Sequence, residues 1–85
     1  MFIHLGENTV INSKDVITII DLDSTTVSKI TRDFLSEATK EKIVINVSEE
    51  LPRSAVICEK KGKKTVYISQ ISPQTLQKRL IKGKL

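Results

Sequence analysis

Short runs of β-branched residues, broken by turn residues, constrain the fold of this chain more than any other feature. Residues 16–20 and 43–47 consist almost entirely of valine, isoleucine and threonine, and the first run predicts a strand that is buried on both faces. Four further strands are predicted at residues 2–5, 9–11, 54–59 and 65–69. Because the turns between neighbouring strands are short, we expect mostly antiparallel pairing.

A helical pattern interrupts the strands in the middle of the chain. Apolar residues recur there at helical spacing, at Val27, Ile30, Phe34 and Ala38. This spacing predicts an amphipathic helix of about four turns with one stripe that faces the core. The polar segment before it contains Asp21 and Asp23, which we expect to cap the helix because carboxylates are favourable near its positive end.

A second, shorter helix is predicted near the C-terminal end. Ser72 suits the N-cap, and Pro73 suits the first helical position, where no amide donor is needed. Leu76 and Leu80 share one face of this helix, and Gly83 suits its C-cap.

These elements predict the order β-β-β-α-β-β-β-α. The fold class is α+β, a mostly antiparallel β-sheet with one amphipathic helix and a short C-terminal helix. At 85 residues there is room for one domain, which we assign to residues 1–82, with residues 83–85 as a basic C-terminal tail. Since one helix covers only one face of a sheet, strands apolar on both faces predict a homo-oligomer, a ring closed by head-to-tail contacts.

The charges are distributed unevenly along the chain. The last acidic residue is Glu59, so residues 60–85 sum to a charge of +8 while residues 1–59 sum to −4. This asymmetry suggests a polyanionic partner, with nucleic acid as the first candidate and an anionic membrane surface as the second. A solubilising hairpin tip at residues 60–64, turned by Gly62, together with a frayed basic tail explains the same charges equally well.

The sequence offers little to catalysis or metal binding. It lacks phosphate-binding glycine motifs and the zinc-protease motif. The single histidine, His4, lies between apolar neighbours and is expected to be partly buried and hydrogen-bonded, or to lie at an interface. Cys58 is expected to be a small buried hydrophobe. We therefore expect no enzyme, no cofactor, no metal and no small-molecule substrate.

Neither a membrane span nor a secretion signal is apparent. No apolar run approaches the roughly 18 residues of a membrane span, and the start of the chain lacks a basic segment followed by a long apolar stretch. One cysteine excludes an internal disulfide framework. We expect a protein of the reducing cytoplasm that does not bind membranes.

Two groups of short motifs carry a family resemblance over nearly the whole chain. The first is Ile3-x-Leu5-Gly6, then Val10-Ile11, a turn, and Val16-Ile17-x-Ile19; the second is Ser72-Pro73-x-Thr75-Leu76-x-x-Arg79-Leu80. In order and spacing they resemble the Rem family of bacterial extracellular-matrix regulators. The start at residues 2–6 and the segment Pro52-Arg53-Ser54 are closer to the RemB branch than to RemA.

The resemblance implies a small DNA-binding regulator with a fold similar to the LytTR-type DNA-binding domain. It further implies assembly into rings that contact duplex DNA, with activation of biofilm-matrix genes as the best-known role. Lys14 stands where RemA-like proteins have an arginine after the second strand, and Arg53 is what this chain retains of their arginine pair.

On this basis Lys14 and Arg53 are the first candidates for phosphate contacts. Charge alone adds three auxiliary candidates at the hairpin tip, Lys61, Lys63 and Lys64. Phosphate contacts position a protein without reading sequence, and a ring repeats a weak site many times. The alternative is an oligomeric scaffold or protein-interaction protein that does not bind DNA. The incomplete arginine pair and the acidic pair Glu49-Glu50 favour it.

Overall fold

The computed structural model describes residues 1–23 and 28–83 of the chain. Its elements are β1 (Phe2–Gly6), β2 (Thr9–Asn12), the short 3-10 helix η1 (Ser13–Asp15), β3 (Val16–Asp21), α1 (Lys29–Lys40), β4 (Val44–Asn46), β5 (Ser54–Lys60), β6 (Lys63–Ser69) and α2 (Pro73–Gly83). Two helices with mostly antiparallel strands confirm the α+β class. Within the described residues, neither helix is long and apolar enough to cross a membrane.

The strands form two sheets rather than the single sheet predicted. β1 and β2 form a separate antiparallel hairpin, and the other four strands form a sheet in the order β3-β5-β6-β4. The pairs β3–β5 and β5–β6 are antiparallel, whereas β4 runs parallel to β6. The sequence pattern could not separate the hairpin from the sheet, because both consist of similar short apolar strands.

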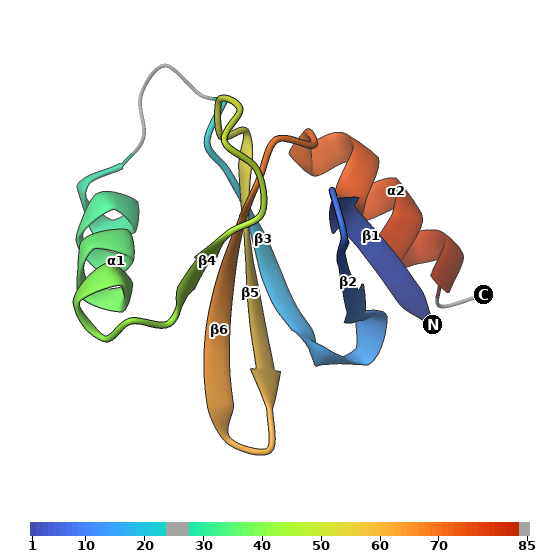
Figure 1. Ribbon diagram of the computed structural model, residues 1–85, viewed down its shortest axis with the longest axis horizontal. Coiled ribbons are helices and arrows are strands. Elements are labelled where there is room, and N and C mark those ends of the chain that lie inside the picture. The colour runs from blue at the N-terminus through green and yellow to red at the C-terminus, as the bar shows by residue number, and fades with distance from the viewer. Residues whose placement is uncertain (24–27, 84–85) are drawn as a thin grey trace.

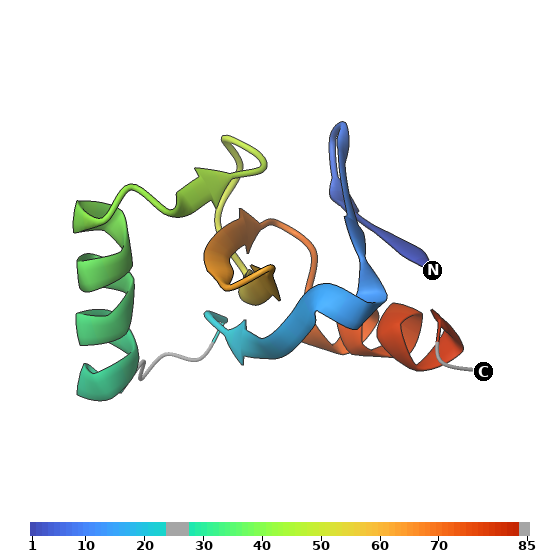
Figure 2. The same ribbon diagram turned by 90° about the horizontal axis from the view of Figure 1, so that it is seen from below.

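The molecule has three layers, with the four-stranded sheet in the middle (Figures 1 and 2). α1 covers one face, and the β1–β2 hairpin together with α2 covers the other. The central strand β5 contributes side chains to both faces of the sheet. Ala55 and Ile57 pack in the core cluster under α1, while Val56 and Cys58 pack in the cluster that contains Leu76 of α2. The premise that one sheet face stays uncovered was therefore wrong, because the chain's own hairpin and second helix fill it.

Buried hydroxyl groups join the second layer to the sheet. Ser69 Oγ donates to the carbonyl oxygen of Leu5 in β1 at 2.6 Å and accepts from the amide of Ile71 at 3.1 Å. Ser54 Oγ donates to the carbonyl oxygen of Ile71 at 2.9 Å. Because buried backbone groups need partners, these serines fix the position of β1 and of the segment that leads into α2.

Two expectations about burial were wrong. β3 is an edge strand, so Ile17 and Thr18 are exposed rather than buried on both faces. Ile30 is 83% exposed, because α1 packs through its C-terminal half, where Phe34, Leu35 and Ala38 contact the sheet. Val27, the first residue of the predicted stripe, lies outside the described residues.

Helix capping was predicted correctly for α2 and wrongly for α1. Ser72 Oγ accepts from the amide of Thr75 at 3.2 Å, and Pro73 is the first residue of α2. The N-cap of α1 is Ser28, whose Oγ accepts from the amide of Thr31 at 3.1 Å. Asp21 instead accepts from the amide of Asp23 at 2.7 Å, in a turn that precedes the helix.

Candidate nucleic-acid interface

Five exposed lysines gather at one end of the sheet, which we call the basic end. They are Lys14, Lys60, Lys61, Lys63 and Lys64. Lys61 and Gly62 form the two-residue turn between β5 and β6, with φ values of 52° and 79°. The positive φ at Gly62 confirms the predicted role of this glycine at the hairpin tip. The β5–β6 register sets Lys60 opposite Lys63, so lysine side chains crowd on both strands of the hairpin.

Lys14 reaches the same end through η1. Its amide donates to Asn12 Oδ1 at 3.2 Å, which caps this short helix, and β3 begins two residues later at Val16. Val16 pairs with Cys58, two residues before Lys60, so η1 lies beside the base of the β5–β6 hairpin. Two carboxylates, Asp15 and Glu59, share this end, which leaves a net charge of three positive on its seven charged side chains.

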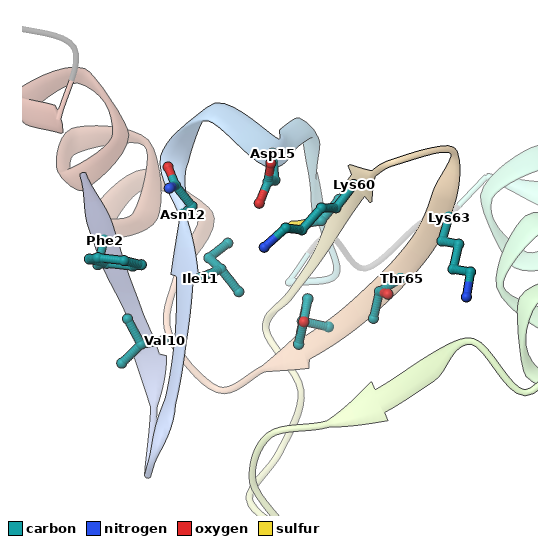
Figure 3. Close-up of a pocket in the computed structure, with 10 residues that line it drawn as sticks. Phe2, Val10, Ile11, Asn12, Asp15, Lys60, Lys63 and Thr65 are labelled. Carbon is teal, nitrogen blue, oxygen red and sulfur yellow. The ribbon is translucent and has the colours of Figure 1, made fainter.

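An open cleft of about 350 Å³ separates the basic end from the β1–β2 hairpin. The residues that give it its chemistry are Phe2, Val10, Asn12, Asp15, Lys60 and Lys63. Figure 3 shows the side chain of Lys60 extending from β5 toward the hairpin, on the side of Asn12. The cleft combines apolar surface from the hairpin with amine and carboxylate groups from the sheet end.

Cys58 lies at the base of this cleft and is not chemically activated. Burial, with a smaller contribution from Asp15, raises the pKa of its thiol to about 11. Burial likewise raises the pKa of Tyr67, with added contributions from Cys58 and Asp15. A thiol that stays protonated at neutral pH is a poor nucleophile, and its burial confirms the prediction of a small buried hydrophobe.

Arg53 lies at the opposite end of the same strands. It precedes β5, whose first residue Ser54 pairs with Asp21 at the end of β3. Its Nε donates to both carboxylate oxygens of Asp23 at 3.2 and 3.0 Å, and its Nη2 lies 3.0 Å from Asp23 Oδ2. This hydrogen-bonded pair raises the pKa of Arg53 and partly neutralises its charge.

The two residues suggested by the family comparison are therefore not neighbours within one copy. Lys14 belongs with the tip lysines, whereas Arg53 forms an ion pair at the far end of β3 and β5. Sequence analysis missed the role of Asp23, because the two partners are 30 positions apart and only the β3–β5 register brings them together. The side chain of His4 is exposed on β1, so of the two predicted alternatives the partly buried histidine was wrong, and the interface histidine stays a prediction.

Comparison with known proteins assigns the chain to a class of regulators. Residues 2–80 match the family described as RemA-like, Extracellular matrix regulatory protein A-like. The chain belongs to this family, which confirms the resemblance drawn from its motifs.

A relative from the B branch matches this chain, as the motif at its start predicted. The chain is 34% identical over 79 residues to Extracellular matrix regulatory protein B of Bacillus subtilis (strain 168). The aligned region covers 93% of this chain and 89% of that protein, so the likeness extends over essentially the whole fold.

Proposed function

We propose that this protein is a cytoplasmic, non-enzymatic regulator of transcription that assembles into a ring and binds duplex DNA through its phosphate groups. Its targets would be extracellular-matrix genes of the kind associated with biofilms. Membership of a family of extracellular matrix regulatory proteins supports a regulatory role. The observation that carries the DNA-binding part is the basic end, where five exposed lysines surround a two-residue turn and η1.

Exposed lysines at the hairpin tip suit contacts with the phosphate backbone of DNA better than they suit recognition of base edges. Lysine is a flexible point charge, and phosphate contacts set position and affinity without reading sequence. We rank Lys61, Lys63 and Lys64 first and Lys14 beside them. Arg53 comes after these, because Asp23 must release its guanidinium before a phosphate can bind.

Assembly would turn this small charge into useful affinity. One copy offers about three to five phosphate contacts. Each contact makes the slope of log K against the logarithm of salt concentration more negative by about 0.9. A ring that presents several basic ends to one duplex makes every contact after the first intramolecular, so avidity replaces single-site strength.

The test is duplex binding across a salt series for the parent, the triple variant Lys61→Ala/Lys63→Ala/Lys64→Ala and a matched triple on α1. The α1 control, Lys29→Ala/Arg32→Ala/Lys40→Ala, removes the same charge from exposed helical positions. We expect the tip variant to reduce the salt slope by about 2.7 for each copy that touches DNA, and the control to leave the slope nearly unchanged. Equal losses in both triples would place the binding surface elsewhere.

A second candidate function is an oligomeric scaffold that binds another protein and not DNA. It is favoured by the ion pair that occupies Arg53 and by exposed apolar side chains such as Phe2 and Leu51. The same salt series decides between the two functions, because a scaffold would not bind duplex DNA even at low salt.

A further inference from the structure

An exposed apolar surface with basic surroundings lies where α2 runs beside β1. Phe2 and Ile81 are 71% and 61% exposed, and Met1, which precedes Phe2 in the chain, is also exposed. Arg79 Nη1 donates to the carbonyl oxygen of His4 at 2.9 Å, which holds α2 against β1. A hollow of about 490 Å³ between the two elements is lined by Phe2, Arg79 and Lys82 among others. A second hollow of about 360 Å³ on α2 is lined by Lys78 and Ile81, and Arg79 and Lys82 line both hollows. We call Met1, Phe2, Lys78, Ile81 and Lys82 the basic patch.

The composition of the basic patch specifies the chemistry of its partner. Residues 1–6 and 60–85, which supply it, contain no aspartate or glutamate. A partner surface must therefore be acidic to match Lys78 and Lys82. It must also be apolar to cover Phe2 and Ile81, a requirement that phosphates alone do not meet.

A surface with these two properties exists elsewhere on the same chain. The β1–β2 turn presents Glu7, and the loop after β4 presents Glu49 and Glu50, all of which line one open hollow of about 600 Å³. The amide of Glu50 donates to Ser48 Oγ at 3.0 Å, which shapes the loop. Leu51, the next residue, is 81% exposed. We call Glu7, Glu49, Glu50 and Leu51 the acidic patch.

We propose that the basic patch of one copy docks on the acidic patch of a second copy. β1 begins at the basic patch and ends at the turn that carries Glu7, so the two patches lie at opposite ends of this strand and cannot meet within one chain (Figure 1). Contact between two different patches is heterologous, and it produces a ring where the rotation between copies closes. This inference rests on the assembly in the proposed function, for which it names the two surfaces.

The docking leaves the tip of the basic end free. The basic end is formed by the β5–β6 turn and η1, and neither contributes a residue to the two patches, but Phe2 of the basic patch lines the same cleft as Lys60 and Lys63. Lys61 and Lys64 do not line this cleft, so charge changes at these two lysines should leave assembly intact.

The experiment reverses the charge of each patch and measures particle mass in native mass spectrometry without DNA. Variant A is Lys78→Glu/Lys82→Glu, and variant B is Glu49→Lys/Glu50→Lys; all four side chains are exposed. Each variant alone should fall to the monomer mass of 9.5 kDa, because like charges then face each other. An equimolar mixture of A and B should reassemble, since every contact between them again joins opposite charges.

A matched control separates this inference from DNA binding. Lys61→Glu/Lys64→Glu makes the same charge change as variant A at exposed positions of the basic end that do not line the cleft of Phe2, and it should assemble like the parent while losing duplex affinity. The inference is overturned if the parent is monomeric, if A and B each assemble alone, or if their mixture stays monomeric. It is also overturned if variant A assembles normally but loses duplex binding, because the basic patch then belongs to DNA.

Discussion

The ion pair between Arg53 and Asp23 allows one substitution to test whether Arg53 takes part in the proposed DNA binding. Asp23→Asn removes the negative charge that faces the guanidinium but keeps the size of the side chain. If Arg53 then becomes free to contact a phosphate, each copy on the duplex gains one contact. The salt slope should steepen by about 0.9 per copy, which is roughly a threefold to fourfold larger loss of affinity between 50 and 200 mM salt.

The fold itself should tolerate this change. The pair is partly exposed, and exposed ion pairs contribute little to stability, so the thermal midpoint should stay close to that of the parent. The assay is fluorescence anisotropy with a short duplex at several salt concentrations. Arg53→Gln combined with Asp23→Asn should return the slope to the parent value, because the newly freed cation is then absent.

A second ion pair supplies the matched control. Lys29 and Asp33 on α1 lie 3.0 Å apart and are also exposed, so Asp33→Asn makes the same change in net charge and also breaks a surface pair. It should leave the slope unchanged. If both substitutions strengthen binding equally, the effect is one of net charge; if neither changes it, Arg53 does not contact DNA. Either result refutes the reasoning.

Three further predictions concern the fold. Ser69→Ala leaves the carbonyl of Leu5 and the amide of Ile71 without their partner and should cost about 1–3 kcal/mol in urea denaturation, whereas exposed Ser36→Ala should cost little. Gly6→Ala should destabilise the protein more than Gly62→Ala in the same assay. Both glycines have positive φ, but a Cβ at Gly6 would lie 2.9 Å from Gln70 Oε1, while Gly62 faces open space. Because the pKa of Cys58 is raised from 9.0 to about 11, the folded state favours the protonated thiol. Its contribution to stability is complete below pH 9.0 and is lost as the pH rises to about 11. The difference in free energy of unfolding between the parent and Cys58→Ala, measured across this pH range, should reveal this loss.

Local chemistry made the strands, the second helix and the basic tip predictable from the sequence. β-branched runs, a serine-proline start and a glycine among lysines each act within a few residues, and the structure contains all three features. The errors lie where burial depends on distant pairing. The apolar run at residues 16–20 would suit a central strand or an edge strand. Ile17 is exposed because β3 pairs with β5 on one side and, within the described residues, has no strand on its other side.

The candidate site divides along the same line. Lys60 to Lys64 are neighbours in sequence, so their grouping needs no knowledge of the fold. The separation of Lys14 from Arg53, and the pairing of Arg53 with Asp23, follow from the antiparallel register between β3 and β5. A sequence comparison aligns residues one position at a time, and it does not show at which end of a strand each residue lies.

The length of β3 bears on how a duplex would lie on the molecule. Its six residues separate Lys14 from the Arg53–Asp23 pair by about 20 Å, at about 3.3 Å per residue. A duplex that touched both ends would have to run along this edge strand, over the exposed side chains of Ile17 and Thr18, which carry no charge to offer a phosphate. A duplex that crossed the β5–β6 turn would meet Lys61, Lys63 and Lys64 within a few residues of chain and would leave the ion pair intact. The second orientation gains more contacts without breaking an existing one, and for this reason we place the tip ahead of Arg53.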